Sequence, residues 1–142
     1  MFASLLIANR GEIVARIART ARRLGVATVA IASDADRGAP FTAACDQVVA
    51  IGGELAVDSY LRIDKIIAAA TSSGAHAIHP GYGFLSERAD FADAVLAAGL
   101  AWIGPPPAAM RAMADKAAAR RRMQAAGVPI LPGSPDPIAV TV

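Results

Sequence analysis

Short apolar runs alternate with segments of helical periodicity along most of this sequence, and the alternation limits the possible folds more than any other feature. The runs are rich in Val, Ile, Leu and Ala and are too short for helices, so they predict buried β-strands. Between them, apolar residues recur every three or four positions, which is typical of amphipathic helices. The expected strands are residues 4–8, 26–32, 47–51, 75–79 and 100–103.

Strands that alternate with helices through short connections form a parallel sheet covered on both faces. We therefore expect an α/β fold with a doubly wound, Rossmann-like parallel sheet of five strands in the order 3-2-1-4-5. Residues 1–127 are expected to form this domain. Residues 128–142 contain four prolines, which predicts a linker.

Four of the expected helices are preceded by a residue that can cap the first turn: Asn9, Asp58 or Ser59, Ser86 and Asp115. Glu12 lies three residues after Asn9, so this pair can form a capping box. Asp115 interrupts a stretch of Ala and Met that could otherwise continue one helix. Because Asp favours a cap over a helix interior, we expect a break there, with Lys116 as the first residue of the next helix.

Composition excludes several classes of protein. The 142 residues are 55% hydrophobic, yet no apolar run approaches the roughly 18 residues that a membrane-spanning helix needs. A net charge of +2 and few aromatic residues disfavour nucleic-acid binding. The single cysteine, Cys45, cannot form an internal disulfide, and the first residues do not resemble a signal sequence. These observations predict a cytoplasmic protein that binds neither membrane nor nucleic acid.

In an open parallel sheet, ligands bind beyond the carboxyl ends of the strands, where the strand order reverses. This places the candidate site in the loops after the first and fourth strands, residues 9–12 and 79–87. The first loop, within A-N-R-G-E-I, has one glycine, whereas a dinucleotide site needs three. Glu12 would also place a negative charge where a phosphate would bind. A Rossmann dehydrogenase is therefore disfavoured.

The second loop, H-P-G-Y-G-F-L-S-E, combines two glycines with two aromatic residues. Gly81 and Gly83 permit positive φ and the close approach of a ligand or another segment. Phe84 is expected in the core and His79 in a structural role. Tyr82 can either pack in the core or face a ligand. Its place at the switch point leads us to expect it at the mouth of a groove formed by the carboxyl ends of the first and fourth strands. His, Cys and carboxylate residues show no metal-ligand spacing.

The motifs A-N-R-G-E-I and H-P-G-Y-G-F-L-S-E also carry a resemblance to a known family. Further matches, in the same order and spacing, are S-D-A-D-R, S-Y-L, W-I-G-P, M-A-D-K and A-G-V-P-I-L-P-G-S. On these motifs, which extend to about Ser134, the sequence resembles the N-terminal segment of biotin carboxylase. That enzyme is a component of acyl-CoA carboxylases and of pyruvate carboxylase.

The resemblance implies the preATP-grasp domain of an ATP-dependent ligase. The family's enzyme activates bicarbonate as carboxyphosphate and transfers the carboxyl group to biotin, with ATP, Mg²⁺ and biotin as the cofactors of the complete enzyme. Through its match to M-A-D-K, Lys116 is implied to approach the nucleotide phosphates. Tyr82 and Gly83 match the loop that borders the carboxylation pocket near biotin.

The family's metal-binding glutamates and further catalytic residues lie beyond residue 142. We therefore expect no catalytic residue and no metal ligand within this sequence, and no activity from these residues alone. The implied partners are the remaining ATP-grasp domains, a biotin carboxyl carrier domain and a carboxyltransferase subunit, and the chain is a candidate homodimer. The alternative is a stand-alone domain that binds a carboxylase subunit or a nucleotide without catalysis.

Overall fold

The computed structural model describes residues 2–131, and the chain divides into two compact units, Met1–Gly104 and Pro105–Val142. Among the described residues, no helix combines the length and the apolar character that crossing a bilayer requires.

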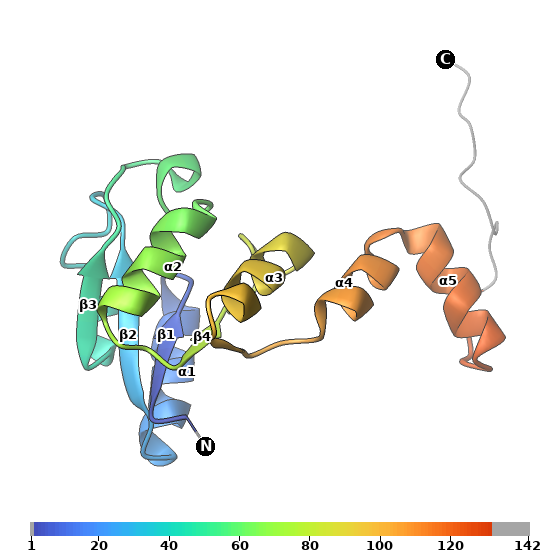
Figure 1. Cartoon of the computed structure of the whole chain (residues 1–142), viewed down its shortest axis with the longest axis horizontal. Helices are drawn as coiled ribbons and strands as arrows, with labels where there is room; N and C mark the ends of the chain where they lie inside the picture. Colours follow the sequence, from blue (N-terminus) through green and yellow to red (C-terminus); the bar gives the residue numbers. More distant parts are fainter. Residues whose placement is uncertain (1, 132–142) are drawn as a thin grey trace. The chain divides into compact units, whose positions relative to one another are not determined.

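The first unit is built on a parallel sheet of five strands in the order β3-β2-β1-β4-β5 (Figure 1). Its strands are β1 (Ser4–Ile7), β2 (Ala27–Ala32), β3 (Gln47–Ala50), β4 (Ala77–His79) and β5 (Ala101–Trp102). The central strand, β1, pairs with β2 on one side and β4 on the other, so that Leu6 lies opposite both Val29 and Ile78. The predicted strand order and direction are confirmed.

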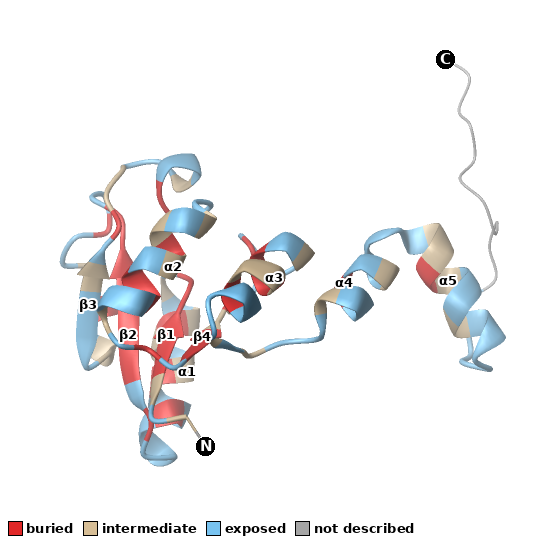
Figure 2. Ribbon diagram, viewed as in Figure 1, coloured by how far each residue is buried: buried red, intermediate tan, exposed pale blue. Residues whose placement is uncertain are grey.

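Successive residues of a strand point to opposite faces of the sheet, and the core is accordingly split into two clusters. On one face, Leu6 and Ile78 pack with residues of α2 (Ile63–Ser72) and α3 (Ala89–Ala97). On the other face, Leu5 and Ile7 pack with residues of α1 (Glu12–Arg23). Figure 2 shows the buried residues concentrated on the central strands and on the helix sides turned toward them. Helices on both faces are the doubly wound arrangement that the sequence predicts.

Helices α2 and α3 begin later than the capping residues predict. Ser59 and Tyr60 are drawn into the core, so the chain before α2 forms a 3-10 turn, Ala56–Asp58, and the helix begins only at Ile63. Leu85 is likewise buried, and hydrogen-bonded turns around it delay the start of α3 to Ala89. The helix starts predicted at Asp58, Ser59 and Ser86 are therefore wrong, because burial of nearby side chains outweighed the local capping preference.

The second unit contains α4 (Pro107–Ala114) and α5 (Lys116–Ala125). Asp115 separates them with an extended backbone, and its Oδ1 accepts hydrogen bonds from the backbone N–H groups of Ala117 and Ala118 at 2.8 and 3.1 Å. These two bonds hold the pKa of Asp115 below its ordinary value. The predicted break, the cap and the position of Lys116 are confirmed. Most of the expected linker, residues 128–142, lies outside the described residues.

Replacing Phe91 tests the core between the sheet and α3. Its ring is fully buried and meets the ring of Trp102 edge-on, with centroids 5.4 Å apart. Phe91→Ala should lower the free energy of unfolding by about 3–5 kcal/mol, because it leaves a cavity that the core cannot close. On the same helix, Leu96 is 49% exposed, and Leu96→Ala should change the free energy by only about 0.5 kcal/mol. Urea titrations followed by circular dichroism measure both, and equal losses would contradict this packing.

Candidate functional site

Asn9 joins the two loops in which the sequence places the candidate site. It follows β1, and its Nδ2 donates hydrogen bonds to the carbonyl oxygens of Pro80 and Tyr82, each at 2.8 Å. Its Oδ1 accepts from the backbone N–H of Arg10 at 2.9 Å, and the side chain is buried. One amide therefore fixes the loop after β4 to the end of β1.

The predicted capping box at α1 is wrong. The helix begins at Glu12, the cap position is held by Gly11 with a φ of 71°, and no side chain caps the first turn. Both residues of the expected box act on the other loop instead, since Asn9 binds its backbone and Glu12 accepts a hydrogen bond from the Tyr82 hydroxyl at 2.7 Å. The buried carbonyl of Pro80 and the partly buried carbonyl of Tyr82 have a greater need of a donor than the end of a helix that can bind water.

Gly81 and Gly83 both have positive φ, but only one of them lies against other atoms. A Cβ on Gly81 would lie 2.7 Å from Nδ2 of Asn9, whereas a Cβ on Gly83 would have nothing within 4 Å. Gly81 is therefore required by the close approach of Asn9, and Gly83 by its backbone conformation alone.

Tyr82 is exposed, with 62% of its surface accessible. The sequence leaves open whether Tyr82 packs in the core, and the structure shows that it does not. The hydrogen bond to Glu12 holds its hydroxyl and raises the pKa of Tyr82. Phe84 differs from expectation, because it remains partly exposed and stacks on Tyr60 with ring centroids 5.3 Å apart. Leu85, the next residue, enters the core instead.

A network around Asp36 supports this edge of the sheet, and the sequence interpretation missed it. Asp36 is buried and accepts hydrogen bonds from the hydroxyls of Tyr60 and Ser33 at 2.8 and 3.1 Å. Its second oxygen lies 3.3 Å from the guanidinium of Arg10, which also lies 5.9 Å from the centre of the Tyr60 ring. The motifs S-D-A-D-R and S-Y-L contain Asp36 and Tyr60, and these were the available signal.

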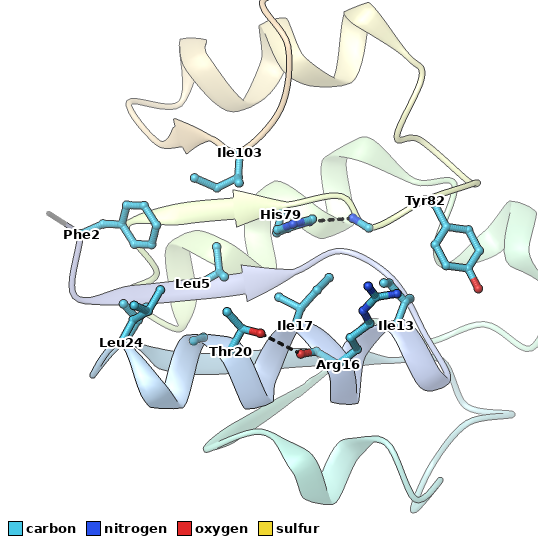
Figure 3. Close-up of a pocket in the computed structure, with 13 residues that line it drawn as sticks. Phe2, Leu5, Ile13, Arg16, Ile17, Thr20, Leu24, His79, Tyr82 and Ile103 are labelled. Carbon is cyan, nitrogen blue, oxygen red and sulfur yellow. Dashed lines mark hydrogen bonds between the residues drawn. The ribbon is translucent and has the colours of Figure 1, made fainter.

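An apolar groove of about 410 Å³ runs along α1 on one face of the sheet (Figure 3). Phe2 and Leu24 lie at one end, near the start of β1, and Tyr82 lies at the other, beyond the end of β4. The expected position of Tyr82 at the mouth of a groove agrees with this arrangement, although the groove follows the helix rather than crossing the two strand ends.

His79 lines the same groove in the structural role that the sequence predicts. Its Nδ1 accepts a hydrogen bond from the backbone N–H of Gly81 at 2.9 Å, so this nitrogen carries no proton. Burial lowers the pKa of His79, which favours the neutral ring.

Lys116 lies in the second unit and is exposed at the start of α5. The carboxylate of Asp115 already occupies the N–H groups of Ala117 and Ala118. These two N–H groups are therefore not available to a phosphate, and the exposed lysine amine is what this end of the helix offers to an anion. Within residues 2–131, no three His, Cys, Asp or Glu side chains come together as a metal site.

Comparison with known proteins decides the family. The family described as "Biotin carboxylase, N-terminal domain" matches residues 1–110, which include both loops joined by Asn9. The chain belongs to this family.

Individual relatives agree with this assignment to the biotin carboxylase N-terminal domain family. The chain is 59% identical, over 91% of its length, to the methylcrotonoyl-CoA carboxylase subunit alpha of Oryza sativa subsp. japonica, of which it covers 18%. The crystal structure of a biotin carboxylase–β-γ-ATP complex from Campylobacter jejuni superposes with a TM-score of 0.90 and 44% identity, over 95% of this chain and 30% of that one. The urea carboxylase of Kluyveromyces lactis superposes with a TM-score of 0.89 and 46% identity, over 92% and 12%. The chain thus spans less than a third of the length of these relatives.

A methyl group at residue 81 tests the contact with Asn9. Gly81→Ala and Gly74→Ala both place alanine at a φ near +67°, which costs roughly 1–2 kcal/mol. Gly74 has nothing within 4 Å of its Cβ position, so it is the matched control. Gly81→Ala should lower the free energy of unfolding by at least about 2 kcal/mol more, because Asn9 must shift and leave the carbonyls of Pro80 and Tyr82 unpaired. Equal losses in urea titrations would show that the close approach is unimportant.

Acid titration tests the neutral state of His79. Because burial lowers its pKa below the ordinary 6.5, the unfolded chain takes up this proton first as the pH falls. The free energy of unfolding should therefore decline as the pH is lowered from about 6.5 toward 5. His79→Gln should remove most of that decline, whereas His76→Gln, at an exposed histidine, should retain it. Identical pH profiles for the two variants would refute the role of His79.

Proposed function

We propose that this chain is the N-terminal domain of a biotin carboxylase, which uses ATP and bicarbonate to carboxylate biotin. Membership of the biotin carboxylase N-terminal domain family is the observation that carries the proposal. One of the relatives is named as a biotin carboxylase in complex with ATP, and the relatives' chains extend well beyond the part that matches this one. We propose ATP, Mg²⁺ and biotin as the cofactors of the complete enzyme. We therefore assign catalysis to a complete enzyme that includes the remaining ATP-grasp domains.

The names of the relatives support a role for this domain in the carboxylation of biotin, and not in the selection of the molecule that finally accepts the carboxyl group. They include carboxylases of methylcrotonoyl-CoA and of urea, two acceptors with little chemistry in common. A domain shared by such enzymes serves the step that they share. The biotin carboxyl carrier domain and the carboxyltransferase are then the partners that receive the product of this step.

Lys116 is proposed to bind the phosphates of ATP. Its ammonium group is a compact point charge on a flexible stem, and it is exposed at the first residue of α5. The cap by Asp115 fixes where the helix begins and hence where the lysine side chain starts. Lys116 positions phosphate oxygens and stabilises their charge; it does not exchange a proton with them.

Tyr82 and Gly83 are proposed to border the pocket for biotin. The Tyr82 hydroxyl is bound to Glu12, so the face of the exposed ring remains as a flat wall against which an apolar ligand can pack. Gly83 adds no side chain beside that wall. These two residues would place biotin and exclude water on one side of it.

Kinetics of a complete carboxylase that carries this domain test the assignment of Lys116. Lys116→Gln should raise the KM for ATP or lower kcat at least tenfold, because an uncharged amide cannot neutralise phosphate charge. Lys65→Gln is the matched control, since Lys65 lies on α2 in the other unit and donates to the carbonyl of Asp58. It should change neither constant by more than about twofold.

Unchanged ATP kinetics for Lys116→Gln would contradict the assignment. A complete protein that binds a carboxylase subunit or a nucleotide, but catalyses no bicarbonate-dependent ATP cleavage, would instead favour the stand-alone domain without catalysis.

A further inference from the structure

We propose that Asn9 is a positioning residue for biotin. Its side-chain amide holds residues 80–83 in the one conformation that presents Tyr82 and Gly83 to the ligand. This inference rests on the proposed function of that loop. The sequence suggests a helix cap for Asn9, and the buried position of its side chain does not by itself point to a ligand.

The two hydrogen bonds of Nδ2 act on the middle of the loop. They end on the carbonyl oxygens of Pro80 and Tyr82, which lie on either side of Gly81, and each is 2.8 Å long. Both amide protons are thus used on one short stretch of backbone, and Oδ1 is used on the N–H of Arg10. These three hydrogen bonds together fix the orientation of the Asn9 amide.

The ends of the loop are held without Asn9. At its start, the carbonyl of His79 accepts a hydrogen bond from the N–H of Ala8 at 2.8 Å. At its end, Leu85 is buried in the core and Phe84 stacks on Tyr60, whose hydroxyl is held by Asp36. Losing the amide of Asn9 should therefore release the span between these points while the fold persists.

The remaining contacts of the span are not sufficient to hold it. The hydroxyl of Tyr82 binds Glu12, but this bond joins two exposed side chains and competes with water. The N–H of Gly81 binds Nδ1 of His79, which belongs to the same short segment. Among the described contacts, only Asn9 joins the backbone of residues 80–82 to a neighbouring strand end through a buried side chain.

A positioning role predicts a selective kinetic effect. The ATP contact that we propose, Lys116, belongs to the other compact unit of the chain. A change in the loop should therefore alter the response to biotin and leave the response to ATP nearly unchanged. A general loss of stability would instead lower the amount of active enzyme, and with it the apparent kcat for both substrates alike.

The experiment uses the complete carboxylase with free biotin as the substrate. Asn9→Asp keeps the shape of the side chain and the acceptor for the Arg10 N–H, but it turns an oxygen toward two carbonyl oxygens. It should raise the KM for biotin at least tenfold and change the KM for ATP by less than twofold.

Thr28→Val is the matched control. Thr28 is buried, and its hydroxyl exchanges hydrogen bonds with Asp46 at the amino end of the strands, remote from Asn9 along β1 and β2. This variant loses partly buried hydrogen bonds and should lower the Tm, yet leave the KM for biotin within twofold. If Thr28→Val raises that KM as much as Asn9→Asp does, the role of Asn9 is structural and the inference is overturned.

Tyr82→Ala separates this inference from the function on which it rests. If Tyr82→Ala raises the KM for biotin and Asn9→Asp does not, the positioning role of Asn9 is refuted while the loop keeps its proposed function. If neither variant changes that KM, the assignment of the loop to biotin fails, and the inference fails with it. A selective rise in both variants supports the two together.

Discussion

The carbonyl oxygens of Pro80 and Tyr82 need hydrogen-bond donors, and the side-chain amide of Asn9 supplies both. β4 ends at His79, so no neighbouring strand can serve these carbonyls. Leaving the buried carbonyl of Pro80 unpaired would cost on the order of 1–3 kcal/mol, and the partly buried carbonyl of Tyr82 would add to that cost. Most of the local geometry follows from this requirement, including the need for glycine at residue 81 and the absence of a side-chain cap on α1.

A second buried polar group, the carboxylate of Asp36, determines how the side chains pack beyond the carboxyl end of β2. A charge in this position is tolerable only when it is paired and hydrogen-bonded. Tyr60, Ser33 and Arg10 provide those partners, and Tyr60 must enter the core to do so. Burial also raises the pKa of Tyr60, which keeps its phenol protonated and able to donate. The late start of α2 and the stacking of Phe84 are consequences of where that ring lies.

The proposed contacts with biotin and with ATP fall in different compact units of the chain. Tyr82 and Gly83 belong to the sheet unit, where tertiary hydrogen bonds hold them, whereas Lys116 is placed by a local device, the cap at Asp115. This division suits an enzyme in which the Tyr82 ring, held in place by hydrogen bonds, and the flexible Lys116 side chain contact two different substrates. The chain covers only 18% and 30% of two of the relatives compared above, so each of them contains much more than these two units.

The sequence by itself determined the strand order, the two-faced packing, the break at Asp115 and the family, because each depends on local periodicity, on one strong cap or on a short motif. It also located the edge of the sheet at which Tyr82 lies. Only the tertiary structure decided what Asn9, Glu12, Tyr60 and Asp36 do. Apart from the local bonds of Asn9 with Arg10 and of Asp36 with Ser33, their partners lie 24 to 73 residues away in the chain, as in the bonds of Tyr60 to Asp36 and of Asn9 to Tyr82. Capping preferences are worth about 1 kcal/mol, and a buried polar group that lacks a partner costs as much or more, so the demands of burial prevailed wherever the two conflicted.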